Sequence, residues 1–149
     1  MMRAMKRIFG CVILGLVTIA ASAQWSDPAS DIPAYNAAAP TKPIPPVLSG
    51  DKLTGEYFSH PYQVTAYKMA AAIPKILYQQ PCYCHCDRAL GHNSLHSCFS
   101  STHGATCSVC LKEAVYSYQQ NKAGKTAKQI RAGIERGEWQ QVDLEKAAL

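Results

Sequence analysis

Cysteine and histidine residues are concentrated in one stretch of this 149-residue sequence. Six of the seven cysteines and four of the five histidines fall between positions 82 and 110. Cysteine thiolates and histidine imidazoles bind zinc, and thiolates also bind copper(I). This density of soft and borderline ligands predicts a metal–thiolate site. Its candidate ligands are Cys82, Cys84, Cys86, His92, Cys98, His103, Cys107 and Cys110.

The first three candidate cysteines alternate with other residues, as Cys82-Tyr83-Cys84-His85-Cys86. In an extended segment, alternate side chains point to the same face, so we expect the three sulfurs to project together. Three converging thiolates repel one another unless a cation binds them. A disulfide across a single residue would close a strained ring. The spacing therefore favours a metal ion.

The last two candidates form a Cys107-x-x-Cys110 pair at the start of a predicted helix, where the helix dipole favours thiolate. The same spacing occurs in zinc sites and in thioredoxin-like redox pairs, so by itself it does not separate the two. It is not a c-type haem site, because Leu111 follows where histidine would be required. His92 and His103 are ordinary zinc ligands beside thiolates.

The N-terminal residues are typical of a secretory signal peptide. A basic start is followed by an apolar run at 8–20 and by Ala21-Ser22-Ala23, a small-x-small cleavage site. The apolar run is shorter than the ~20 residues of a membrane-spanning helix. We therefore expect residues 1–23 to be removed, and the protein to be periplasmic or extracellular and free of the membrane after cleavage.

Export bears on both charge and cysteine chemistry. The formal net charge is +5, and it falls when the basic start is removed, so the composition gives little reason to expect nucleic-acid partners. Outside the cytoplasm thiols tend to form disulfides unless a metal or a redox role keeps them reduced. No paired-carboxylate, Ser-His-Asp or phosphate-loop motif indicates an enzyme, and no feature identifies a protein partner.

The elements that must position the ligands follow a proline-rich segment at 24–55. Prolines fix φ and remove hydrogen-bond donors, so we expect this segment to be an extended, poorly packed tether. The alternative is a loop that wraps around the domain, anchored by Trp25 or Tyr35. Residues 56–149 then form one small Cys/His-rich domain.

Three segments of this domain carry apolar residues at helical spacing. Pro61 suits the first position of the first segment, and Pro74 ends or kinks it. Thr126 and Gln129 have the spacing of a capping box at the start of the third. The predicted helices cover residues 61–73, 106–121 and 126–136, with a short helical turn at 93–99.

We therefore predict a mainly α fold: a small single domain of about three helices around an irregular Cys/His-rich loop. The apolar content of three short helices is modest for a domain of this size. We expect metal or disulfides in the cysteine region to add stability.

The cysteine segment also resembles a known family. Residues 60–137 are similar to the PCYCGC-motif or CYCXC family of exported bacterial proteins, some of which carry selenocysteine. His85 departs from the name-giving motif, which has glycine there, and Cys11 lies in no credible lipobox. The resemblance implies secretion and a metal or redox centre, while the family's biochemical role is unassigned. It rests on Gln80-Pro81-Cys82-Tyr83-Cys84-His85-Cys86, Gly91-His92, Cys98-Phe99, His103 and Cys107-x-x-Cys110.

Three functions remain open at this point. The favoured one is an exported protein that binds zinc or copper(I), for metal handling or for structure, and it requires no enzymatic activity. The second is a thiol redox protein that uses Cys107 and Cys110 as its reactive pair. The third is a structural or binding domain held by three disulfides, whose pairing the sequence does not decide.

Overall fold

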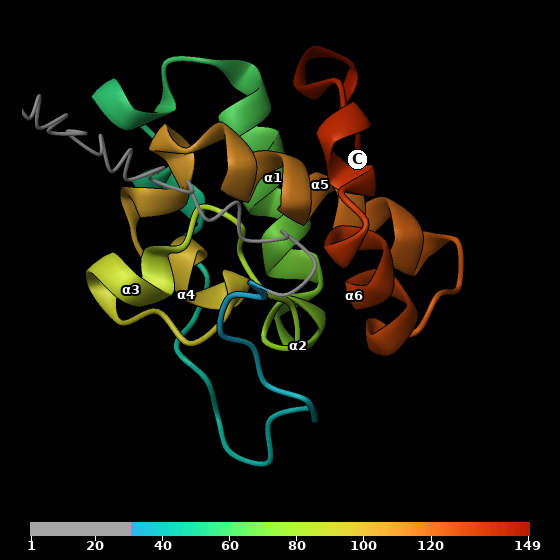
Figure 1. Ribbon diagram of the computed structural model, residues 1–149. Coiled ribbons are helices and arrows are strands. Elements are labelled where there is room, and N and C mark those ends of the chain that lie inside the picture. The colour runs from blue at the N-terminus through green and yellow to red at the C-terminus, as the bar shows by residue number, and fades with distance from the viewer. Residues whose placement is uncertain (1–30) are drawn as a thin grey trace, which may run out of the picture.

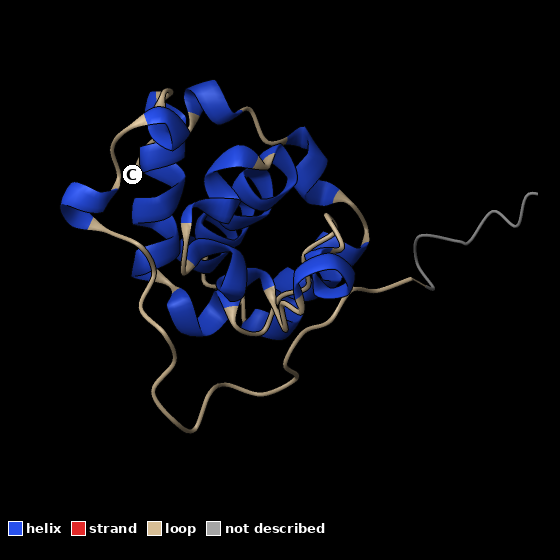
Figure 2. Cartoon of the chain, turned by 90° about the vertical axis from the view of Figure 1, so that its left-hand side faces the viewer, coloured by secondary structure: helices blue, strands red, loops and turns tan. Residues whose placement is uncertain are grey.

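The structure is a computed structural model that describes residues 31–149; the predicted signal peptide and the first part of the predicted tether lie outside them. Within this range the chain is helical and has no strand (Figures 1 and 2), which confirms the mainly α prediction. None of these helices is long and apolar enough to cross a membrane. The α-helices are α1 Pro61–Ala72, α2 Pro74–Leu77, α3 Cys86–Leu90, α4 Leu95–Phe99, α5 Ser108–Lys122 and α6 Ala127–Glu135.

Short 3-10 turns connect or follow these helices. They are η1 Gly50–Lys52, η2 Glu56–Phe58, η3 Thr102–Thr106, η4 Glu138–Gln141 and η5 Leu144–Lys146. The three predicted helices and the predicted turn at 93–99 are present as α1, α5, α6 and α4, with ends that differ by one or two residues. Helices α2 and α3 were not predicted, because four and five residues are too few to show a helical period.

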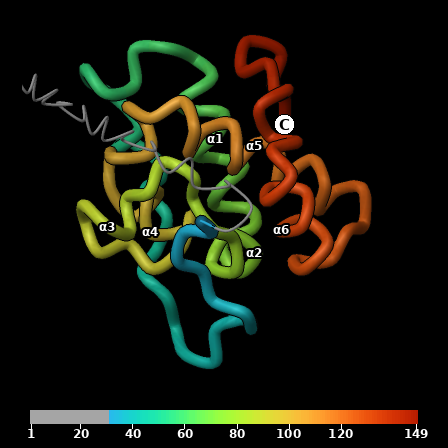
Figure 3. The backbone as a smooth tube through the Cα atoms, viewed as in Figure 1, coloured from blue at the N-terminus to red at the C-terminus, as the bar shows by residue number. Residues whose placement is uncertain are grey.

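Helix α5 is the centre of the domain (Figure 3). It contacts α1 on one side and α6 and η4 on the other, and η3 lies near its start. Its buried residues therefore face more than one direction: Leu111 and Val115 belong to the main core, whereas Tyr116 belongs to a second cluster. The second cluster also contains Ile130, Ile134 and Trp139.

Helix α6 begins with the predicted capping box. The backbone N–H of Gln129 donates to the Thr126 hydroxyl at 3.3 Å, and the Thr126 N–H donates to the Gln129 side chain at 2.9 Å. These bonds satisfy donors that a helix start leaves unpaired. Ile130 and Ile134 lie one turn apart and are fully buried against α5 and η4.

Gly133 allows α6 to pack closely on α5. A Cβ at this position would lie 1.9 Å from the hydroxyl oxygen of Tyr116 and 2.8 Å from a carboxylate oxygen of Glu138. The Tyr116 hydroxyl donates a 2.5 Å hydrogen bond to Glu138, which joins α5 to η4. The missing side chain at position 133 thus leaves room for this bond.

Residues 31–55 lie against the helical domain. In Figure 1 they start as a blue-to-cyan loop below α2 and α4. Val47 and Leu53 are buried in the main core, and the N–H of Leu48 donates to the carbonyl of Phe99 at 2.8 Å. This part of the chain differs from the poorly packed tether that we expected, because its apolar residues pack into the main core of the helical domain.

Polar contacts also hold the same segment. The Asn36 amide donates to the carbonyl of Tyr78 at 3.0 Å, and the guanidinium of Arg131 lies 4.4 Å from the ring centroid of Tyr35. Tyr35 is one of the two anchors named for the wrapping alternative. The other anchor, Trp25, lies outside the described residues.

Candidate metal centre

The first three ligands lie on a tight turn that leads into α3. The N–H of His85 donates to the carbonyl of Cys82 at 3.0 Å, and His85 has the left-handed φ of 54°. The extended conformation expected for this triplet is therefore wrong. The expected convergence is nevertheless present, because the sulfurs of Cys82, Cys84 and Cys86 lie within 4.8 Å of one another.

Four cysteines form one group, which we call the thiolate quartet: Cys82, Cys84, Cys107 and Cys110. The Cys82 sulfur lies 3.4 Å from those of Cys84 and Cys110, and the latter two are 3.6 Å apart. Cys107 is included because its thiol affects the pKa of Cys84, although it lies in no group of ligand atoms within 4.8 Å of one another. The quartet thus joins the turn to the first residues of α5.

A second group, the mixed quartet, consists of Cys86, His92, Cys98 and His103. The sulfurs of Cys86 and Cys98 are 3.2 Å apart, and Nδ1 of His92 lies 3.2 and 3.3 Å from them. The ring of His103 is perpendicular to that of His92, with centroids 5.1 Å apart. One ligand atom of each residue lies within 4.8 Å of the others.

The structure brings seven of the eight predicted ligands into groups whose ligand atoms lie within 4.8 Å of one another, whereas Cys107 lies in none of these groups. His96 is different: it is buried outside both quartets, beside the backbone of Pro45. Nε2 of His103 is buried and has no hydrogen-bond partner, so this nitrogen is free to bind a cation. Cys82, Cys86, Cys98 and Cys110 are buried, whereas Cys84 and Cys107 are half-buried.

The sulfur spacing suits ligands around an ion. A Zn–S bond of about 2.3 Å gives a tetrahedron with sulfur–sulfur edges of about 3.8 Å. The separations of 3.2–3.6 Å in the two quartets are close to such edges. They are far from the ~2.05 Å of a disulfide bond. All six cysteines among the described residues are free.

Neighbouring thiols make two of the cysteines easier to ionise. Hydrogen bonds from Cys107, Cys110 and Cys82 lower the pKa of Cys84. A hydrogen bond from Cys82 lowers the pKa of Cys86 to about 7, against the opposing effect of burial. Because the thiolate is the form that binds metal, one ligand of each quartet is prepared for binding.

Glu113 is a site residue that the sequence analysis missed. It is fully buried on α5, one turn after Cys110, and its Oε1 accepts a 2.9 Å hydrogen bond from the N–H of Tyr83. This bond fixes the ligand turn against α5. Burial raises the pKa of Glu113 to about 8, and its Oε2 has no hydrogen-bond partner. The spacing from Cys110, which puts both residues on one helix face, could have indicated it.

Helix α1 holds the turn that carries His103. The Tyr67 hydroxyl donates to the carbonyl of Ser101 at 2.6 Å and accepts from the N–H of Ala105 at 3.0 Å. The Gln63 amide donates to the carbonyl of Ala105 at 2.8 Å. Both side chains are buried, so these bonds fix both ends of η3.

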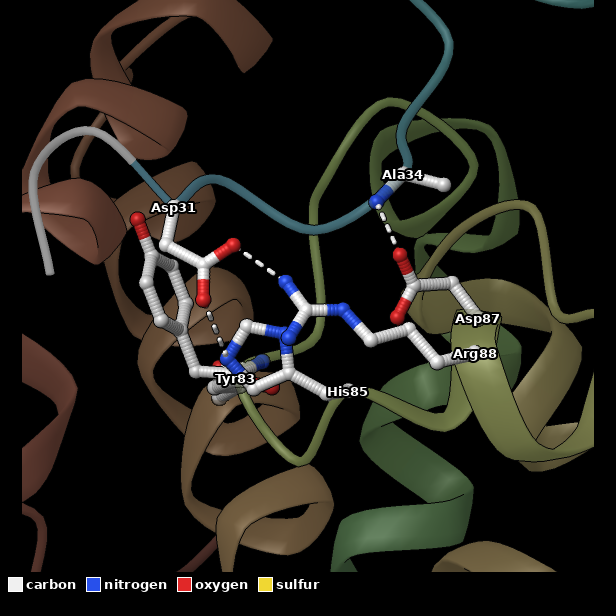
Figure 4. A network of polar contacts seen from close by, with 7 residues as sticks. Asp31, Ala34, Tyr83, His85, Asp87 and Arg88 are labelled. Atoms are coloured by element: carbon white, nitrogen blue, oxygen red, sulfur yellow. Dashed lines mark hydrogen bonds and ion pairs between the residues drawn. The ribbon is translucent and has the colours of Figure 1, made fainter. Parts of the chain in front are cut away.

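The N-terminal segment is tied to the outer side of the ligand turn (Figure 4). The Asp31 carboxylate lies 4.0 Å from the His85 ring and forms an ion pair with Arg88. The N–H of Ala34 donates to Asp87 at 3.1 Å. Residues far apart in the sequence thus meet where α3 begins.

Residues 57–141 match the family described as "Protein of unknown function with PCYCGC motif". The chain belongs to this family. The match includes all eight candidate ligands and confirms the resemblance noted in the sequence. No curated protein and no solved structure matches the chain.

The structure explains the glycine in the name of the PCYCGC family. The motif's glycine position is His85 here, and its φ of 54° lies in the left-handed region that glycine adopts at least cost. The turn therefore keeps a glycine-like backbone although the residue is histidine.

Proposed function

We propose that this PCYCGC-family chain is an exported metal-binding protein whose Cys/His cluster holds zinc or copper(I). The observation that supports this most is the convergence of seven of the eight predicted ligands, from five segments between residues 82 and 110, onto one place. Six thiols and a carboxyl group in a mostly buried place would be costly to ionise without a cation.

Two features of the cluster bear on the choice of metal. The mixed quartet has two sulfur and two nitrogen ligands, a common tetrahedral zinc set. The thiolate quartet has four sulfurs, a set that binds zinc and also suits the softer copper(I) ion. Export rests on the N-terminal sequence, and an exported protein of either kind would bind, store or pass on the ion.

The intact mass of the protein isolated from its native compartment tests this proposal. Masses under non-denaturing and denaturing conditions give the bound metal, its identity and the number of disulfides together. We expect zinc or copper, and no disulfide among the six clustered cysteines. Three disulfides without metal would contradict the proposal and support the disulfide-held domain instead.

Variants can show whether the cluster is the binding site. Cys84→Ser should lower the amount of bound metal. His103→Ala should lower it too, whereas His60→Ala is a matched control, because the His60 side chain stacks on Tyr62 outside both quartets. Equal metal content in all three variants would contradict binding at the cluster.

A thiol redox role is the second candidate, and the geometry of the thiolate quartet supports it. Cys84 and Cys107 are half-buried, and each has another thiol of the quartet next to it. An attacking and a resolving thiol are thus in place. A metal-free isolated protein in which one of these two cysteines is selectively alkylated at neutral pH would favour this role over metal binding.

A further inference from the structure

We infer that seven of the predicted ligands, all except Cys107, form one dinuclear centre, in which two metal ions share the thiolate of Cys98. This inference rests on the proposed function and adds the number and arrangement of the ions. The mixed quartet provides four donors, the number that one tetrahedral ion takes. Cys82, Cys84 and Cys110 provide three more, and the shared Cys98 completes a second set of four. The chain therefore has ligands for two ions.

The two quartets are in contact with each other. Cys98, of the mixed quartet, lies within 4.8 Å of Cys82 and Cys84, and in a second group within 4.8 Å of Cys84 and Cys110. His103 also lies within that distance of Cys84 and Cys110. These separations between quartets are of the same order as those inside one tetrahedral site, so two ions bound here would be neighbours.

Cys98 is the ligand best placed to bridge the ions. It belongs to all three four-residue groups of ligand atoms that lie within 4.8 Å of one another. Its side chain is fully buried, so no water can satisfy the lone pairs that a single metal–sulfur bond leaves free. A bridging thiolate uses one of these lone pairs to bind the second cation. Cys84, which is half-buried, can be hydrated as a terminal ligand instead.

Cadmium-113, an NMR-active substitute for zinc, tests the arrangement directly. We expect the reduced protein to bind two cadmium ions in native mass spectra and to show two cadmium resonances split by scalar coupling through the shared sulfur. A single ion, or two resonances without mutual coupling, would overturn the dinuclear centre while leaving metal binding intact. A protein isolated without metal that also binds no cadmium would overturn the proposed function itself.

Two cysteine variants identify the bridging atom. Cys98→Ser should abolish the cadmium–cadmium coupling, because the shared sulfur is gone. Cys107→Ser is the matched control: its sulfur lies in none of the three groups of ligand atoms, so both ions and their coupling should persist. Coupling that survives in Cys98→Ser would overturn the assignment. If Cys98→Ser does not fold, the coupling in the unmodified protein still decides between a dinuclear centre and separate sites.

Discussion

His85 sits in a left-handed backbone conformation, between two metal-ligand candidates on the ligand turn. A side chain in this conformation costs roughly 1–2 kcal/mol relative to glycine. In partial compensation its ring lies 4.0 Å from Asp31 and makes an edge contact with the Tyr83 ring, with centroids 6.1 Å apart, and ion pairs near the surface contribute little. The residue is therefore a source of local strain next to the site.

The variant His85→Gly should stabilise the fold. We expect a gain of about 0.5–1 kcal/mol in the free energy of unfolding, because the strain outweighs the lost contact with Asp31. Denaturant unfolding of the metal-free, reduced protein measures it. His85→Ala is the control, since it loses the same contact but keeps the strain. If His85→Ala gained as much free energy of unfolding as His85→Gly, backbone strain at His85 would not explain the gain.

Through Glu138, the stability of the folded protein should depend on pH. Hydrogen bonds from Tyr116 and Arg136 lower the pKa of Glu138 below the ordinary value of 4.5. A carboxyl group with a lowered pKa stabilises the folded state above its unfolded pKa, and this contribution is lost as the pH falls through the folded pKa. Part of the stability at neutral pH should thus disappear in acid.

The variant Tyr116→Phe should flatten this dependence, because the hydroxyl is the largest cause of the shift. Thermal melts from about pH 6 to about pH 3 should show a smaller loss of melting temperature in the variant than in the unmodified protein. If both proteins lost the same amount of melting temperature, the Tyr116–Glu138 hydrogen bond would not be the origin of the pH dependence.

At the scale of elements, helix α1 holds the 3-10 turn η3 in position. Tyr67 holds both the carbonyl of Ser101 and the N–H of Ala105, and His103 lies between them. Tyr67→Phe should cost about 1–3 kcal/mol of unfolding free energy, because it leaves the buried N–H of Ala105 unpaired. It should also weaken metal binding through His103. Tyr62→Phe, on the same helix but only half-buried, is the control and should change neither.

Helix α6 depends on the absence of a side chain at Gly133. Gly133→Ala would place a methyl group against the Tyr116 hydroxyl, so we expect a loss of about 1–3 kcal/mol from overpacking. Thermal or denaturant unfolding measures the loss. The double variant with Tyr116→Phe provides space and should recover part of it; simple additivity of the two losses would contradict a direct clash.

The sequence predicted the long helices and the ligands better than the parts that connect them. Apolar periodicity and the Thr126 cap identified α1, α5 and α6, and residue type alone identified the ligands. The turn from Cys82 to His85 was missed because it is fixed by a distant residue, Glu113. The packing of residues 31–55 was only the less favoured alternative, because prolines indicate an extended chain without indicating what it touches.

At the scale of the whole molecule, the metal should contribute to the fold. Apart from Cys107 and Cys110 at the start of α5, the ligands come from short turns and helices of five residues, so binding energy is also folding energy. Free metal at 100 times its dissociation constant stabilises a protein by about 2.7 kcal/mol, or roughly 10 °C for a domain of this size.

Removing metal from the reduced protein should therefore lower the melting temperature by at least about 10 °C. Hydrogen exchange should increase most between residues 82 and 110, and less in α6, whose core is separate. Chelation that leaves the melting temperature unchanged would contradict a metal that supports the fold.

The second hydrophobic cluster gives the protein an internal optical reporter. Trp139 is nearly buried there, and Tyr83, which lies between Cys82 and Cys84, packs against the same cluster. A change in the ligand turn therefore moves a ring that packs against the cluster to which the indole belongs. The emission of Trp139, read in a chain whose Trp25 is replaced, can follow the state of the sulfur cluster without an added dye.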